Sequence, residues 1–90
     1  MPAIDRFQTF SDTSIGPSRA PFAITPNDSV ELGLVPKALY VGTGGTIVLR
    51  GLDAAADVIF KNLANGQILD VRAQFVRATG TTASDIVGLA

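Results

Sequence analysis

The stretches Ala38-Leu-Tyr-Val-Gly-Thr-Gly-Gly-Thr46 and Arg77-Ala-Thr-Gly-Thr-Thr-Ala-Ser-Asp-Ile-Val87 decide the fold class of this chain. Each joins a short apolar segment, typical of a β-strand, to a run of glycine and threonine that can turn the chain. The alternation of short strands and turns continues over residues 21–90, and no helical stripe of useful length competes with it. We therefore predict an all-β fold, a small antiparallel β-sandwich or jelly-roll-like barrel of six to eight short strands.

The individual strands and turns follow from local sequence. Gly42–Gly45 is expected to turn the chain into a return strand, and Asn65-Gly66 is a hairpin signal. Val76 breaks the alternation of the longest strand, which predicts a bulge or a bend between sheets there. Strands are expected over 20–25, 37–41, 46–52, from 58–60 up to the turn at 65–66, and over 67–79 and 85–90. A further polar–apolar alternation covers 29–34, a turn is expected at 25–28, and loops are expected at 53–57 and 79–84.

Residues 1–20 are expected to form an extended N-terminal arm in front of a single β-domain over 21–90. All five prolines lie in the first 36 residues, and proline disrupts regular hydrogen-bond ladders. The arm nevertheless contains Phe7, Phe10 and Ile15, which a purely disordered tail would not need. These side chains either dock on a neighbouring subunit or another protein, or fold back on the chain's own core. A short helix over 4–10 is a weaker alternative.

The composition predicts association with other chains. Ninety residues allow one domain, whose small core gives limited stability unless disulfides, metal or partners add to it. Cysteine and histidine are both absent, which removes disulfides and the usual zinc or copper ligands. The chain is 47% hydrophobic and only 17% charged, so it has more apolar side chains than one small core uses. We therefore expect a homo-oligomer.

Charge and hydropathy argue against nucleic-acid and membrane partners. The formal net charge is −1 with acids and bases interspersed, so no basic run is available for phosphates. No apolar stretch approaches the roughly 20 residues of a membrane-spanning helix, and no signal-peptide pattern is present. These features fit a protein kept in the cytoplasm until it is assembled.

The sequence offers little for chemistry, so we expect no enzyme. Nucleophilic catalysis needs a base, normally histidine, and the carboxylates are spread singly through the chain. Gly42–Gly45 lacks the following lysine and helix of a phosphate-binding loop. Asp53 and Asp57 lack the spacing of a calcium loop. We therefore assign no catalytic, cofactor-binding or metal-binding residue.

The remaining candidates are assembly contacts. Tyr40 is the only tyrosine, and its hydroxyl must reach water or a partner if the ring is buried. Arg72 and Arg77 lie on or beside an expected strand, where they could pair with Asp70 or Asp85 of a neighbouring subunit. A solvated sheet face is the alternative explanation for both arginines. The candidate assembly residues are Phe7, Phe10, Ile15, Tyr40, Arg72 and Arg77.

Together with Ile24-Thr-Pro-Asn-Asp-Ser29, the two opening stretches resemble the head-spike base proteins of gene transfer agents and related tailed-phage particles. The resemblance covers residues 22–90 and does not reach the first twenty. It implies a structural virion protein that forms a ring, in our expectation of five chains, on the vertices of the particle head. The ring would bind the capsid protein, support a spike or fibre, and be assembled in the bacterial cytoplasm. The family brings no catalytic or cofactor residue with it.

A receptor- or glycan-binding module is the alternative from a different functional class. Small sandwiches often bind sugars through exposed aromatic rings, and Tyr40 would be the residue to provide one. That function predicts affinity for a host polysaccharide that is lost on Tyr40→Ala.

Overall fold

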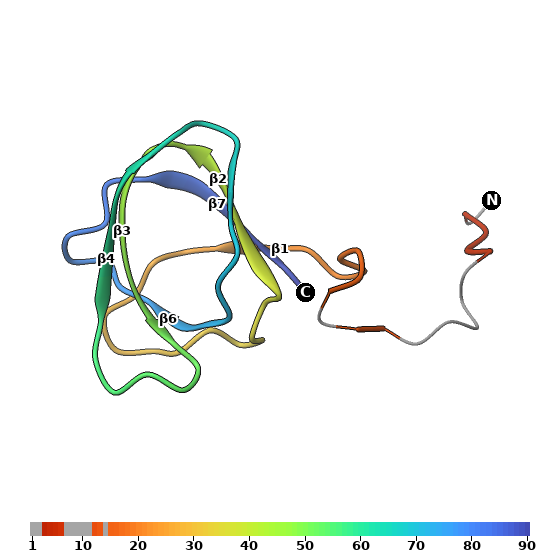
Figure 1. Cartoon of the computed structure of the whole chain (residues 1–90), viewed down its shortest axis with the longest axis horizontal. Helices are drawn as coiled ribbons and strands as arrows, with labels where there is room; N and C mark the ends of the chain where they lie inside the picture. The colour runs from red at the N-terminus through yellow and green to blue at the C-terminus, as the bar shows by residue number, and fades with distance from the viewer. Residues whose placement is uncertain (1–2, 7–11, 14) are drawn as a thin grey trace.

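The computed structural model of the chain describes residues 3–6, 12–13 and 15–90, and it shows two antiparallel β-sheets packed face to face (Figure 1). The predicted all-β sandwich is therefore confirmed, and the described residues contain no helix. One sheet has the strand order β1-β7-β2-β5 and the other the order β4-β3-β6. The strands are β1 Phe22–Ile24, β2 Ala38–Thr43, β3 Gly45–Gly51, β4 Val58–Leu63, β5 Gln67–Leu69, β6 Ala73–Val76 and β7 Ser84–Leu89.

The core lies between the two sheets and is built from alternating strand positions. In β2, Leu39 and Val41 are fully buried while Tyr40 between them faces outward, and β3 buries Ile47 and Leu49 in the same way. This period of two is what a strand with one buried face requires. The buried apolar residues are Ile24, Leu39, Val41, Ile47, Leu49, Leu63, Leu69, Ala73, Val76, Ala83 and Ile86.

The strand expected after Gly42–Gly45 is present as β3, but it does not return beside β2 as predicted. β2 continues through Gly42, only Gly44 separates it from β3, and β3 lies in the other sheet, where it pairs with β4 and β6. A Cβ atom on Gly44 would lie 2.1 Å from the carbonyl oxygen of Leu63. The missing side chain therefore lets the chain pass close to β4 as it crosses from one sheet to the other.

The hairpin predicted at Asn65-Gly66 is also wrong, although the turn itself forms. Gly66 has a φ of 74°, and the Gln67 N–H donates to the Ala64 carbonyl at 3.3 Å. The Gly66 N–H donates to the Val41 carbonyl at 2.7 Å, which places the following residues beside β2. The turn therefore joins strands of different sheets. β5 therefore pairs with β2 instead of β4.

The single long strand expected over 67–79 is divided between the sheets. β5 and β6 are separated by residues 70–72, where the Val71 N–H donates to the Leu69 carbonyl at 2.9 Å and bends the chain. The predicted irregularity exists, but not at Val76. The sheet change comes earlier, and the register against β3 shifts where Gln74 is the extra residue.

The alternation over 29–34 does not form a strand. Asn27 Oδ1 accepts from the N–H groups of Ser29 and Val30, which closes a local turn. The Asn27 N–H donates to the Val76 carbonyl and the Leu32 N–H to the Gln74 carbonyl, each at 2.9 Å. The segment 27–32 thus covers the outer edge of β6. The loop predicted at 53–57 is present in the structure.

Candidate assembly surfaces

The segment just before β1 is fastened to the chain's own sandwich. Ser18 Oγ donates to the Ala90 carbonyl at 2.8 Å, and the N–H groups of Arg19 and Ala20 donate to the same oxygen at 2.9 Å. Lys37 Nζ donates to the Pro17 carbonyl at 3.0 Å and forms an ion pair with Asp12. The hydrogen bond from Lys37 is the main cause that lowers the pKa of Asp12. These contacts fix the path of residues 17–20 along the end of the four-stranded sheet.

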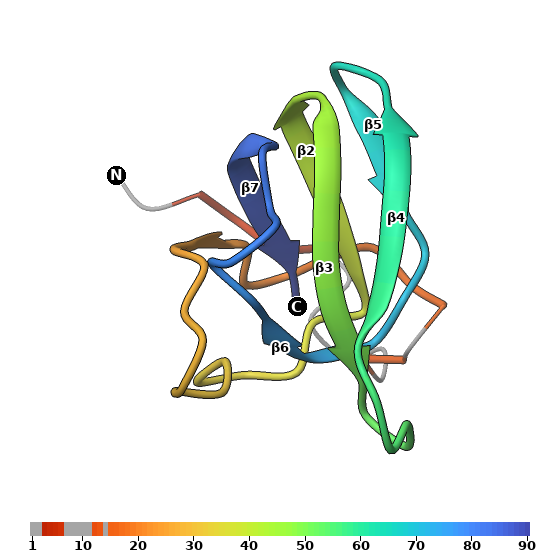
Figure 2. The ribbon, with the colours of Figure 1, turned by 90° about the vertical axis from the view of Figure 1, so that its left-hand side faces the viewer.

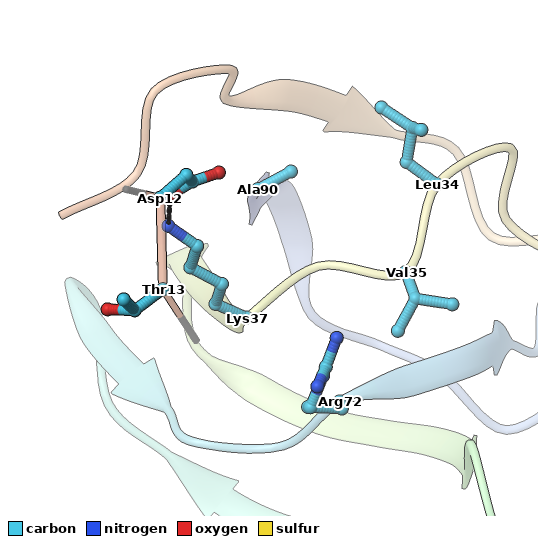
Figure 3. Close-up of a pocket in the computed structure, with 7 residues that line it drawn as sticks. All are labelled: Asp12, Thr13, Leu34, Val35, Lys37, Arg72 and Ala90. Carbon is cyan, nitrogen blue, oxygen red and sulfur yellow. Dashed lines mark hydrogen bonds and ion pairs between the residues drawn. The ribbon is translucent and has the colours of Figure 1, made fainter. Parts of the chain in front are cut away.

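A hollow of about 360 Å³ lies beside this attachment (Figure 3). Arg72, one of the predicted assembly residues, extends into it, and the Lys37–Asp12 pair forms the opposite wall. Lys37, one of the two cationic side chains that line the hollow, is paired with Asp12. The guanidinium of Arg72, the other cation, lies near the apolar side chain of Val35. The hollow is lined by Asp12, Thr13, Leu34, Val35, Lys37, Arg72 and Ala90.

Of the three apolar arm residues, Ile15 can be placed. Its side chain is 96% exposed, next to a second hollow that Ala38 and Leu89 also line. Phe7 and Phe10 lie outside the described residues. Ile15 therefore does not fold back on the core, which leaves docking on another chain as the prediction for it.

Tyr40 lies in an apolar row across the outer face of the four-stranded sheet. The register places it opposite Val87 on one side and Ile68 on the other, and Ala23 continues the row beyond Val87. Tyr40 is 39% exposed and Ile68 59% exposed. No second aromatic ring stands in this row, so the surface is an apolar stripe more than a sugar-stacking platform.

Arg77 makes its described contacts within the chain. Its Nε donates to both carboxylate oxygens of Asp57, at 3.1 and 3.2 Å, and its NH1 donates to the Asp28 carbonyl at 2.7 Å. Its guanidinium also lies over the Phe75 ring, 4.0 Å from the centroid, and that of Arg50 lies 4.4 Å from it. Cation–π contacts of this kind are attractive and hold both guanidinium groups against the Phe75 ring. Arg77 thus joins the 53–57 loop to the turn that Asn27 closes.

The Asp28 carboxylate holds two distant segments together, a role that the sequence analysis missed. Its Oδ1 accepts from the N–H groups of Ala78 and Thr79 at 3.0 and 2.9 Å, and its Oδ2 accepts from the Thr79 hydroxyl at 2.7 Å. These bonds, led by the Thr79 N–H, lower the pKa of Asp28 from its usual 3.8. The sequence identified Asp28 only as a turn former, because its partners are fifty residues away.

We predict that Asp28→Ala lowers the melting temperature at pH 7 and flattens its pH dependence. Because the folded-state pKa of Asp28 is depressed, its stabilisation is present above about 3.8 and is lost as the pH falls through the folded value. Thermal melts at neutral pH and below pH 3.8 test this. Asp53→Ala, in the exposed 53–57 loop, is the matched control and should behave like the unmodified chain. Equal acid sensitivity of Asp28→Ala and the unmodified chain would contradict the prediction.

The three sequence stretches that carried the resemblance meet in space. The first reaches the third through Asp28 and Thr79. The second reaches it through Thr46, whose N–H donates to Thr82 Oγ1 at 3.0 Å and whose carbonyl accepts from the Thr82 N–H at 2.8 Å. Hydrogen bonds between these residues therefore hold the three stretches together within the fold.

The fold and its surfaces define a small all-β protein whose distinctive features are exposed apolar side chains and a fastened N-terminal segment. Across residues 3–6, 12–13 and 15–90, no group of three or more acidic side chains could hold a metal ion. In that same part of the chain, no helix could cross a membrane.

Comparison with known proteins gives the family. No protein-family model matches the chain, and no curated protein matches its sequence. A chain of a solved structure described as "Capsid of native GTA particle computed with C5 symmetry" does match, where GTA stands for gene transfer agent. The two are 40% identical, the match covers 97% of this chain and 100% of the other, and the TM-score is 0.88. The chain belongs to the same family as this gene-transfer-agent particle protein.

Proposed function

We propose that this chain is a structural protein of a gene transfer agent or phage-like particle, and more specifically the base of a head spike. The observation that carries the proposal is the 40% identity, over essentially the whole of both chains, to a chain of a gene-transfer-agent capsid. The C5 symmetry of that particle structure favours a ring of five copies at a vertex. Such a ring would bind the capsid protein on one side and support a spike or fibre on the other, without catalysing a reaction.

The surfaces of the chain support an assembling role. Large apolar side chains remain exposed on several strands, including Val58, Ile59 and Ile68 at 49, 56 and 59%. Exposed apolar patches on a small soluble domain usually mark contacts with other proteins. The described hollows are shallow and contain no convergent set of reactive groups.

The proposed role is tested by removing the gene for this chain from cells that produce particles. Shells should form with normal dimensions but lack vertex spikes, and electron microscopy should locate the tagged chain at the vertices when it is restored. Empty vertices in the presence of the chain, or absence of the chain from purified particles, would contradict the proposal.

We also propose that residues 1–20 act as an arm that fastens the base to the capsid or to a neighbour. Replacing both Phe7 and Phe10 with serine should reduce incorporation into particles at least tenfold, because two buried aromatic contacts are each worth several-fold in affinity. The fold should be unchanged, because the Lys37 and Ala90 contacts that hold residues 17–20 are retained.

Quantitative immunoblotting of purified particles measures the effect on incorporation. Thr9→Ser is the matched control inside the same segment and should be incorporated normally. Normal incorporation of the double serine variant would show that the arm is not the fastening.

A further inference from the structure

Two different surfaces of this chain lie on opposite sides of the sandwich. β4 is the end strand of the three-stranded sheet, and β5 is the end strand of the other sheet on the same side. β1 is the opposite end strand of the four-stranded sheet, and the segment after it covers β6. Figure 2 shows β4 and β5 on one side and the orange-to-yellow segment that follows β1 on the other.

The first surface, which we call the β4 side, is an open strand edge with exposed apolar side chains. β4 is six residues long and, among residues 3–6, 12–13 and 15–90, pairs only with β3, so its outer backbone edge is available to another chain. Val58 and Ile59 are half exposed on β4, and Ile68 is 59% exposed on the adjacent β5. Lys61 is the only charged residue between 58 and 69.

The second surface, which we call the β1 groove, is a hollow of about 320 Å³ along β1. Phe22 and Leu32 form its apolar floor, and both also pack against the core. Val30, which is 63% exposed, stands at its rim beside Glu31. Asp28 and Glu31 are the only charged residues between 22 and 36.

The charges of the two surfaces favour pairing of a β4 side with a β1 groove over pairing of two identical surfaces. Two β4 sides related by a two-fold axis would bring one Lys61 toward the other, and two β1 grooves would bring Glu31 toward Glu31. Like charges placed opposite each other destabilise a contact. A β4 side against a β1 groove instead places a cation beside an anion and apolar side chains beside an apolar hollow.

We infer that the β4 side of one copy binds the β1 groove of the next copy, with Ile59 against Val30 and Lys61, which lies on the same face of β4 as Ile59, near Glu31. Because the contact joins two different surfaces, each copy offers one of each, and repetition generates a closed ring or a filament. The inference rests on the proposed ring and adds to it the surfaces that form the joint.

Charge reversal tests the joint in the full chain. Lys61→Glu and Glu31→Lys should each raise the concentration needed for assembly about tenfold, and the double variant Lys61→Glu/Glu31→Lys should recover most of the loss. Light scattering across a dilution series measures assembly, and circular dichroism checks the fold of each variant. Asp53→Lys, in the exposed loop, is the matched control and should leave assembly unchanged.

Engineered cysteines give a second measurement that does not depend on the charges. The chain has no cysteine, so Val30→Cys and Ile59→Cys introduce unique thiols. A mixture of the two single variants should form mixed disulfide dimers on mild oxidation, and the double variant should form a covalent ladder. Preferential disulfide formation within either single variant, or none in the mixture, would overturn the assignment.

The outcomes also separate this assignment from the proposed function. If the unmodified chain forms rings and the charge-reversal and cysteine variants assemble without the expected effects, the contact between copies lies elsewhere and the spike-base role stands. If the unmodified chain is a monomer at all concentrations, both the joint and the ring fail.

Discussion

Gly44→Ala should be among the most damaging single substitutions in this protein, lowering its free energy of unfolding by about 3 kcal/mol. The added Cβ would meet the Leu63 carbonyl oxygen at 2.1 Å and the Ala64 carbonyl carbon at 2.9 Å, both backbone atoms that cannot rotate away. Gly44 is also the only residue between β2 and β3, and its N–H donates to Asn65 Oδ1 at 2.6 Å. Relief of the clash would therefore separate the β2–β3 corner from the β4–β5 turn.

Urea unfolding at a fixed protein concentration measures the effect, since association would otherwise shift the apparent stability. For a domain of this size the melting temperature should fall by roughly 12–24 °C. Gly33→Ala is the matched control, because no atom lies within 4 Å of its added Cβ. It should change stability by less than about 0.5 kcal/mol. A Gly44→Ala variant as stable as Gly33→Ala would show that the corner is not tightly packed.

Leu39→Ala should destabilise the sandwich by about 2–5 kcal/mol, a large part of the 5–15 kcal/mol typical of a domain. Leu39 is fully buried, and the register places it between Leu69 of β5 and Gly88 of β7. Truncation would leave a cavity where the central strand of the sheet meets its neighbours. The surrounding strands belong to both sheets and can close it only in part.

Leu34→Ala is the control variant, and the free energy of unfolding of both variants is measured by urea titration. Leu34 is 56% exposed, so the same change of side chain should have an effect within about 0.5 kcal/mol. Similar losses for the two variants would place Leu39 outside the cooperative core and contradict the packing described for β2.

The fold class could be predicted from sequence because it depends on local patterns. The alternation of Leu39, Tyr40 and Val41 is enough to define a strand with one buried face, and the glycine-rich runs mark its ends. The pairing of strands could not be predicted in the same way. Gly66 can form a hairpin turn, but its N–H bonds to Val41 instead, and this tertiary contact decides which sheet receives β5.

The candidate surfaces were predicted less completely than the fold. Arg77 was predicted as a candidate assembly contact, with a solvated sheet face as the alternative; in the structure it binds Asp57 and Asp28 within the chain, and a contact with another subunit stays a prediction. The exposure of Val58 and Ile59 was missed, because an apolar run is the same in sequence whether its strand lies in the middle of a sheet or at its edge. Only the strand order reveals that β4 has one free side.

The pairing of β1 with β7 has a consequence for how the protein is made. Phe22–Ile24 leaves the ribosome early, but within the described residues the strand it pairs with is Ser84–Leu89, which is made about sixty residues later. β1 therefore cannot pair before β7 is synthesised, although β2 can pair with β5 earlier. Completion of the four-stranded sheet thus depends on contacts that are distant in sequence. Refolding experiments should accordingly show a single slow phase rather than stepwise gain of structure.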